Sequence, residues 1–216
     1  MDVALIDAGG ANLGSVRYVL ERLGVVPRIV RDGDELRDAG RVILPGVGAA
    51  VPAMRLLHER GFVSPLQRLQ TPLLGICLGM QLLFDRSEEG DVDCLGLLPG
   101  RVVRLPAGEG LRIPHMGWNA LEPRRDSSLL LGIPAGAYAY FVHGYAAPVT
   151  SDCVATSSHG QRFAAVVQRG HCCGMQFHPE RSAQIGAKLL DNFLRWQPNA
   201  SAMRVQDGLQ SRSVAA

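Results

Sequence analysis

The first 81 residues alternate short apolar runs with segments of helical spacing, and this alternation limits the fold more than any other feature. Four apolar runs have the length of buried strands: "VALIDA" (3–8), "VPRIVRD" (26–32), "RVILPG" (41–46) and "TPLLGIC" (71–77). Segments 15–24 and 52–60, which lie between them, have helical spacing. Strands that alternate with helices pair in parallel, so we expect an α/β fold: a doubly wound, mostly parallel sheet with helices on both faces.

The second half of the chain has a different texture. Beyond Gly90, strand-like segments are separated by glycine, proline and serine, which predicts antiparallel strands at the edge of the sheet. A last helix is expected from about Ala183 to Trp196, with Ser182 as its N-cap. A chain of 216 residues suits one domain, which we assign to residues 1–197. The polar, unpatterned residues 198–216 are expected to form a flexible tail.

Charge and hydropathy exclude several classes of protein. The formal net charge is +2, the only lysine is Lys188, and the arginines are scattered, so nothing indicates a nucleic acid partner. The N-terminus lacks the basic and apolar regions of a secretory signal. The longest apolar stretch, 42–54, is interrupted by two prolines and is too short to span a membrane. We therefore expect a soluble, cytoplasmic protein without a membrane partner.

The cysteines indicate thiol chemistry rather than disulfides or metal. There are five, an odd number, and they lack the spacing of a secreted scaffold. Cys172 and Cys173 are adjacent and no C-x-x-C pair exists, so zinc is poorly supported. We expect no metal and no cofactor.

One cysteine lies in a pattern typical of a nucleophile. Gly75, Cys77 and Gly79 form G-x-C-x-G between two apolar runs, the pattern of a sharp strand-to-helix turn that exposes a reactive side chain. Glycines are needed on either side because larger residues would collide where the backbone doubles back. The start of the following helix would favour a thiolate. The alternative is a small buried residue, a common role for cysteine.

A base for this nucleophile is available in "QFHPE" (176–180). Alternate side chains of an extended segment point the same way, so His178 and Glu180 can lie on one side. His178 would take the proton of Cys77 while Glu180 orients the ring, as in a catalytic triad. The alternative is a surface His–Glu pair at a strand end, but the two motifs together favour catalysis.

Two glycine-rich turns are candidate anion sites. "DAGGANLGS" (7–15) fits neither a dinucleotide fingerprint nor a phosphate loop, and a turn capped by Asn12 or Ser15 is the better interpretation. "PGVG" (45–48) could join the N–H of Leu78 as an oxyanion hole for the attacked carbonyl. The alternative is that "PGVG" is an ordinary strand-to-helix turn, and the spacing of its residues, taken alone, favours this alternative.

Taken together, "GICLGMQLLF" (75–84), "QFHPE" and "PGVG" resemble the class I, or triad, glutamine amidotransferases. "IPHMGWN" (113–119), "YFVHGY" (140–145) and "QFHPERSAQIGAKLLDNF" (176–193) are similar, more specifically, to the glutaminase subunits of imidazole glycerol phosphate synthase in histidine biosynthesis. The resemblance covers residues 2 to about 196.

The resemblance implies a glutaminase with a Cys77–His178–Glu180 triad. Cys77 would attack the side-chain amide of glutamine, ammonia would leave, and water would release glutamate from the thioester. The second oxyanion donor would be the N–H of Val47, in a turn whose peptide flips under the partner's control. The resemblance assigns the amino-acid end of glutamine to a further set of residues: Gln81 and the backbone around Gly48, His143 and Tyr145.

The resemblance also implies a partner, a cyclase subunit with a (β/α)8 barrel that forms a heterodimer with this chain and uses the ammonia. A closed interface would keep ammonia from being protonated by water. We expect the interface at "PHMGWN", with Trp118 as its aromatic anchor and with Asn12 and Arg181 beside it. The alternative for Trp118 is a position in the core.

The chain departs from the family pattern at four positions, where tyrosine, phenylalanine, serine and lysine are usual: Ala8, Ala50, Gly144 and Arg181. None belongs to the triad. Two alternatives therefore stay open at this point. One is a paralogue that supplies ammonia to a different synthase, and the other is a catalytically silent subunit that binds glutamine.

Overall fold

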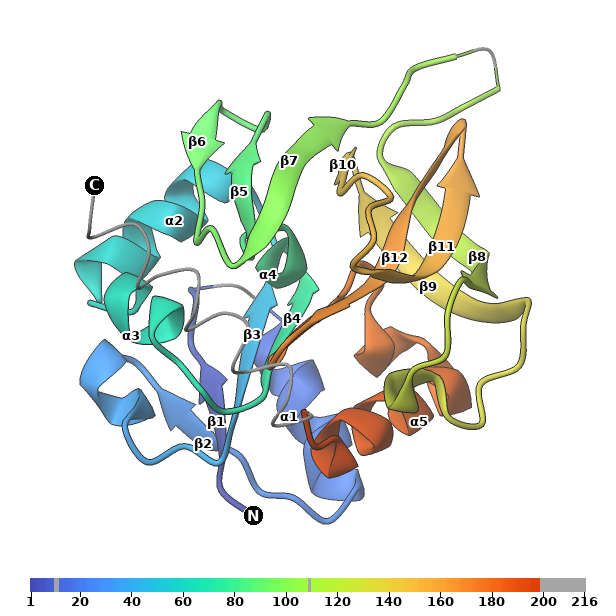
Figure 1. Ribbon diagram of the computed structural model, residues 1–216. Helices are drawn as coiled ribbons and strands as arrows, with labels where there is room; N and C mark the ends of the chain where they lie inside the picture. The colour runs from blue at the N-terminus through green and yellow to red at the C-terminus, as the bar shows by residue number, and fades with distance from the viewer. Residues whose placement is uncertain (10–11, 109, 199–216) are drawn as a thin grey trace, which may run out of the picture.

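The computed structural model describes residues 1–9, 12–108 and 110–198. A nine-stranded sheet crosses the molecule in the order β2-β1-β3-β4-β13-β12-β11-β8-β9. A second sheet of four strands, β10-β7-β5-β6, lies above the ends of β3 and β4 (Figure 1). The predicted flexible tail, apart from Pro198, lies outside the described residues.

The first half of the large sheet is parallel, as predicted. Its strands are β1 (Val3–Ile6), β2 (Arg28–Val30), β3 (Arg41–Gly46), β4 (Leu73–Cys77) and β13 (Cys172–Met175). Every residue of β1, β4 and β13 is buried. Continuous apolar runs suit strands that are covered on both faces, which is why these segments show no polar alternation.

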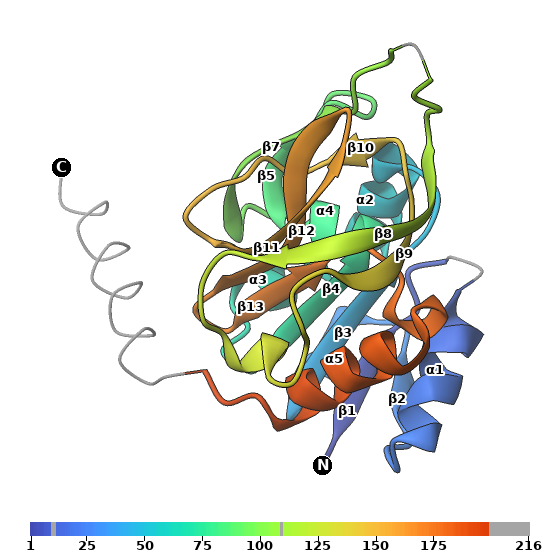
Figure 2. The ribbon, with the colours of Figure 1, turned by 90° about the vertical axis from the view of Figure 1, so that its right-hand side faces the viewer.

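Helices cover both faces of this parallel half, as expected for a doubly wound sheet. α1 (Leu13–Arg22) and α5 (Ala183–Arg195) pack on one face, and Figure 2 shows α5 lying across the front of the strands with α1 beside it. α2 (Ala50–Glu59) and the short α3 (Val63–Gln67) pack on the other face. The core therefore forms two apolar layers, one on each side of the sheet.

The second half of the chain forms hairpins, but not all of them at the edge of the large sheet. β12 (Gln161–Arg169), β11 (Cys153–His159), β8 (His115–Pro123) and β9 (Ala137–His143) are antiparallel, as predicted. The small sheet contains β5 (Phe84–Ser87), β6 (Val92–Asp93), β7 (Leu98–Arg104) and β10 (Tyr145–Ala146), and β5 and β7 pair in parallel. The strand-like segment "RVVRL" (101–105), which we expected at the edge of the large sheet, therefore contributes to a separate sheet, because β7 pairs with β5.

β13 also departs from the predicted arrangement. It pairs antiparallel with β12 but parallel with β4, so it lies inside the sheet and joins its two halves. The position matters for function, because parallel neighbours end at the same edge of a sheet. The segment after β13 therefore emerges beside the end of β4, where Cys77 lies.

Shorter elements complete the chain. They are α4 (Leu78–Gln81) and three 3-10 turns, η1 (Gly33–Leu36), η2 (Ser128–Leu130) and η3 (Pro179–Arg181). Ser182 precedes α5, but its side chain does not cap the helix; its hydroxyl donates to the carbonyl of His178 and accepts from the N–H of Tyr140. Ser182 thus occupies the predicted N-cap position, but a side-chain capping hydrogen bond is absent because the hydroxyl is engaged in tertiary contacts. No helix among the described residues has the length and apolar character needed to cross a bilayer.

Candidate active site

Cys77 lies on a strained turn at the end of β4. Its φ of 53° is in the left-handed region, which non-glycine residues rarely adopt, and α4 starts at the next residue. A Cβ on Gly75 would lie 2.6 Å from the carbonyl oxygen of Gly79, and one on Gly79 would collide with the carbonyl oxygen of Leu44. Both glycines are thus required by close backbone contacts, as the motif predicted. These close backbone contacts keep Cys77 in its strained conformation between β4 and α4.

His178 and Glu180 lie next to this turn because β13 is the neighbour of β4. His178 Nδ1 donates to Glu180 Oε1 over 2.7 Å, and the Glu180 side chain is fully buried. We expected an extended segment to hold the pair, but the structure differs. His178 is extended, but residues 179–181 form the 3-10 turn η3, which brings Glu180 back beneath the ring. The predicted contact is present, although the backbone that makes it is different.

The environment of His178 favours its charged form. Burial acts to lower the pKa of His178, but hydrogen bonds to Cys77 and Glu180, and the negative charge of both groups, raise the pKa to about 10. Because Nδ1 is occupied by Glu180, the other ring nitrogen is the one available to the sulfur. At neutral pH His178 therefore carries a proton that it can deliver to a leaving group.

Asn12 contacts the His178–Glu180 pair, a role that the sequence did not predict. It was expected to cap a turn or to lie at an interface, but its side chain makes no capping hydrogen bond to α1. Its amide nitrogen donates instead to Glu180 Oε1 and lies 3.2 Å from His178 Nδ1. Ser15 is exposed within α1 rather than at its cap. No local pattern reveals the Asn12 contact, because it joins residues 168 positions apart.

A cavity of about 250 Å³ opens beside Cys77. It is lined by all the residues proposed for the oxyanion hole and for glutamine, together with the nucleophile and the base: Val47, Gly48, Cys77, Leu78, Gln81, His143, Tyr145 and His178. Glu180 lies behind His178 rather than in the lining. Of the departures from the family pattern, only Gly144 lines this cavity, while Ala50 is buried next to it and Ala8 lines a neighbouring small pocket.

The "PGVG" turn lies opposite Cys77 and is more than an ordinary connection. Gly46, the last residue of β3, pairs with Cys77, so the turn that follows it reaches the cavity. Gly48 has a φ of 101°, and the N–H of Ala50, the first residue of α2, donates to Glu89 Oε2 over 2.9 Å. The carboxylate of Glu89 thus anchors the end of the turn at the start of α2.

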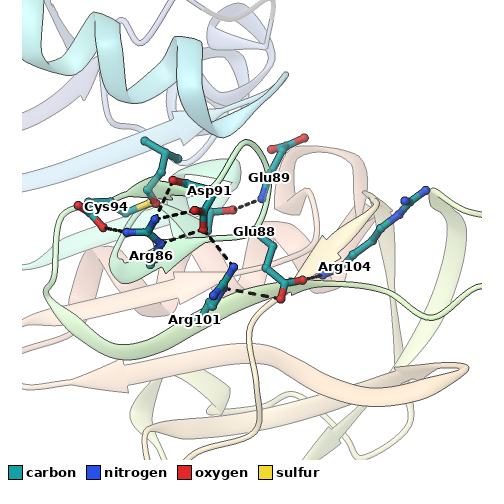
Figure 3. A network of polar contacts seen from close by, with 10 residues as sticks. Arg86, Glu88, Glu89, Asp91, Cys94, Arg101 and Arg104 are labelled. Carbon is teal, nitrogen blue, oxygen red and sulfur yellow. Dashed lines mark hydrogen bonds and ion pairs between the residues drawn. The ribbon is translucent and has the colours of Figure 1, made fainter.

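Glu89 is a lining residue that sequence reasoning missed, and it comes from the small sheet. It lies between β5 and β6, in a hairpin held together by charged side chains (Figure 3). Arg86 pairs with Asp91 and Asp93, and Arg101 pairs with Asp91 and Glu88. Exposed pairs contribute little one by one, but this network fixes the shape of the hairpin that carries Glu89 to the cavity.

A second missed residue is Gln176, which is completely buried. Its amide nitrogen lies 3.9 Å from Cys77 Sγ, and its amide oxygen accepts from Gln81 Nε2 over 3.0 Å. Gln81 Nε2 also donates to the carbonyl of Tyr145 over 2.8 Å. The alternation that paired His178 with Glu180 could have identified Gln176, because it lies two residues before His178 and points to the same side.

The residues expected at a partner interface separate into two groups. Trp118 is 52% exposed on β8, which excludes the alternative of a core position, and its ring stacks edge-on against Tyr140. The exposed Arg181 lies with its guanidinium 6.0 Å above the same Tyr140 ring. Met116 is 65% exposed on the same strand. Trp118 and Arg181 thus share one exposed face, whereas Asn12 is partly buried against the triad.

Residues 4–196 match the family model "Glutamine amidotransferase class-I". The chain is 67% identical over 193 residues to "Imidazole glycerol phosphate synthase subunit HisH" of Xanthomonas campestris pv. campestris, covering 89% of this chain and 96% of that protein. It is 64% identical over 193 residues to the protein of the same name in Xylella fastidiosa, with the same coverage.

Solved structures show the same fold at lower identity. "Crystal structure of glutamine amidotransferase" superposes with a TM-score of 0.70 at 21% identity, covering 90% of this chain and 98% of that one. "Structure of PurLQS from Thermotoga maritima" superposes with a TM-score of 0.68 at 21% identity, covering 90% of this chain and 97% of that one. At this level of identity the likeness concerns the fold alone.

Proposed function

The chain belongs to the class I glutamine amidotransferases, and from this premise we propose that it is the glutaminase subunit of imidazole glycerol phosphate synthase. The relatives that carry this subunit's name are 64% and 67% identical over nearly their full length. The observation that carries the proposal is the cavity beside Cys77, where a strained cysteine faces the His178–Glu180 pair. The protein would act in the cytoplasm, in the biosynthesis of histidine.

In the proposed reaction Cys77 attacks the side-chain carbonyl of glutamine as a thiolate, while its proton is held by His178. The carbon–sulfur bond forms and negative charge develops on the carbonyl oxygen, which the N–H groups of Val47 and Leu78 stabilise. Such donors typically lower a barrier by roughly 3–4 kcal/mol each. The intermediate then expels ammonia, which receives its third hydrogen from His178, and a thioester remains on Cys77.

Hydrolysis of the thioester uses the same residues, with His178 now acting as a base instead of an acid. His178, now neutral, takes a proton from water, and the resulting hydroxide attacks the thioester carbonyl. The carbon–sulfur bond breaks, glutamate leaves, and the imidazolium–thiolate pair is restored. Glu180 stabilises the imidazolium form of His178 through the Nδ1 hydrogen bond throughout the cycle.

The cavity offers contacts that suit the amino-acid end of glutamine. Glu89 is the one acidic residue of the described lining, so its carboxylate is suited to the α-ammonium group. Gln81 and the backbone of Gly48, His143 and Tyr145 would position the rest of the amino acid. A Glu89→Gln variant should raise KM for glutamine while leaving the chemistry at Cys77 intact, because only the charge is lost.

The partner would be a cyclase subunit with a (β/α)8 barrel, bound as a heterodimer. The face that contains Met116, Trp118 and Arg181 suits such an interface, since exposed aromatic, methionine and arginine side chains are enriched there. A closed contact between the subunits would pass ammonia on before water protonates it.

The test measures glutamate release from glutamine by the wild type and by Cys77→Ser, each alone and with the cyclase subunit of the same organism and its ribotide substrate. We expect release by the wild type with the cyclase and ribotide present, and none by Cys77→Ser. Turnover that ignores the cyclase but responds to another synthase would support a paralogue. Glutamine binding without release under every condition would indicate a silent subunit and overturn the proposal.

A further inference from the structure

Two histidines and an asparagine form a hydrogen-bonded row behind the wall of the cavity. His143, at the end of β9, lines the cavity, and its Nε2 lies 3.2 Å from Nδ1 of His115 on β8. Nε2 of His115 lies 3.3 Å from the side-chain nitrogen of Asn119, also on β8. We call His143, His115 and Asn119 the histidine row. The proposed reaction assigns no role to His115 or Asn119.

The partners at the two ends of the row determine where every hydrogen lies. His143 Nδ1 is 2.8 Å from the carbonyl oxygen of Tyr145, which can only accept, so Nδ1 must carry the hydrogen. In neutral His143, Nε2 is then an acceptor, and His115 Nδ1 must be its donor. Nε2 of His115 is in turn an acceptor and receives the Asn119 amide, which also donates to the carbonyl of Ser158. Both rings are thus neutral and carry hydrogen on Nδ1.

Burial supports this neutral arrangement. Both histidines are 5% exposed, and the His115 ring stacks with Phe141 and with His159. Burial, reinforced by the neighbouring His159, lowers the pKa of His115 to about 4. Burial outweighs the hydrogen bond to Tyr145 and lowers the pKa of His143 to about 3. A proton on either ring would place two donors face to face, which the surrounding apolar rings make costly.

The row continues to the nucleophile through groups already described. The Tyr145 carbonyl accepts from His143 and from Gln81 Nε2, and Gln81 is joined to Gln176, which lies 3.9 Å from the sulfur of Cys77. If His115 could not donate, Nε2 of His143 would be a buried acceptor without a partner, which destabilises this position of the ring. The His143 ring could regain a partner by turning toward the cavity, where it would displace glutamine.

We propose that His115 and Asn119 are positioning residues that hold the His143 ring in the wall of the glutamine cavity and so keep the Tyr145 carbonyl and Gln81 in place. This inference rests on the proposed function, since it concerns the binding of glutamine at the same site. It assigns a role to two residues of "PHMGWN", the motif in which the sequence predicted an interface with a core position as the alternative.

A substitution series at His115 separates its hydrogen bond from its shape. His115→Phe keeps a flat ring but removes both nitrogens. His115→Asn keeps a donor in the place of Nδ1, because the amide nitrogen of asparagine is bonded to Cγ, as Nδ1 is in histidine. Phe163→Leu is the control, since its ring packs against both histidines but makes no hydrogen bond with them. Thermal unfolding of each variant shows whether it is folded.

The readout is glutaminase activity of the two-subunit complex. For His115→Phe we expect KM for glutamine to rise about tenfold, the value of one neutral hydrogen bond, with kcat within about threefold of the wild type. His115→Asn and Phe163→Leu should both keep KM within about threefold of the wild type. An unchanged KM in His115→Phe, or an equal rise in Phe163→Leu, would overturn the inference.

The hydrogen positions can be read without any turnover of glutamine. In ¹H–¹⁵N spectra of histidine-labelled protein at pH 7, His115 and His143 should both show the neutral form with hydrogen on Nδ1, assigned by substitution of each. The form with hydrogen on Nε2 in either ring would refute the row. If the wild type released no glutamate, the proposed function would fail, while the spectrum would still decide whether the row exists.

Discussion

The side-chain amide of Asn12 donates a hydrogen bond to the buried carboxylate of Glu180. Glu180 therefore has two donors, Asn12 at the start of α1 and His178, and both bond to the same oxygen. This contact joins the first helix of the fold to the turn that follows β13. The orientation of the His178 ring thus depends on a residue far away in the sequence.

Asn12→Ala should lower kcat of the glutaminase reaction by roughly tenfold or more, because a hydrogen bond to a charged group is worth about 1.5–3 kcal/mol. Asn12→Asp should be worse, since a second carboxylate beside Glu180 repels the first. Steady-state kinetics of both variants in the complex test this. An Asn12→Asp enzyme as active as the wild type would contradict the role given to the contact.

The raised pKa of His178 predicts how stability depends on pH. The pKa is about 10 in the folded protein, against an ordinary value of 6.5 for histidine in an unfolded chain, so the stabilisation is fully present below pH 6.5 and is lost as pH rises through about 10. In Cys77→Ser the pKa should fall toward neutral, because Cys77 provides one hydrogen bond and one charge. NMR titration of the His178 ring measures its pKa in the wild type and in Cys77→Ser. Cys94→Ser, outside the cavity, serves as the control and should leave the titration unchanged.

Alkylation should modify one of the five cysteines. Burial raises the pKa of Cys94 and Cys153 to about 11 and that of Cys172 to about 12, and it raises the pKa of Cys173 well above its usual value. These four therefore remain thiols at pH 8, while Cys77 lines the open cavity. Mass spectrometry after a short treatment with iodoacetamide should find one label, on Cys77, and glutamine should slow its attachment. Equal labelling of Cys94 would show that this reasoning is wrong.

Two glycine-to-alanine substitutions should have opposite effects on stability. A Cβ on Gly79 would collide with the backbone carbonyl of Leu44, which cannot move without disturbing β3, so Gly79→Ala should lower the free energy of unfolding by ~1–3 kcal/mol or more. Gly14, exposed in α1, has no atom within 4 Å of such a Cβ. Gly14→Ala should raise the free energy of unfolding by several tenths of a kcal/mol through helix propensity. Urea denaturation measures both, and a stable Gly79→Ala would contradict the packing of the turn.

Local sequence was sufficient for what depends on neighbours along the chain. Apolar runs and helical spacing predicted β1, β3, β4 and the helices that cover both faces, because burial on two sides leaves a continuous apolar pattern. The glycines around Cys77 predicted the sharp turn, since only a residue without a side chain tolerates so close a backbone contact. Two short motifs likewise predicted the residues of the proposed triad.

Tertiary structure decided what depends on pairing between distant segments. No periodicity in the sequence predicts that β13 lies beside β4, yet this pairing places His178 next to Cys77. Asn12 reaches the site from the start of α1, Glu89 from the hairpin between β5 and β6, and the row from Asn119 to His143 from β8 and β9. Their roles arise from hydrogen bonds that close only when the chain has folded, because a polar side chain by itself is compatible with a cap, a surface position or a catalytic contact.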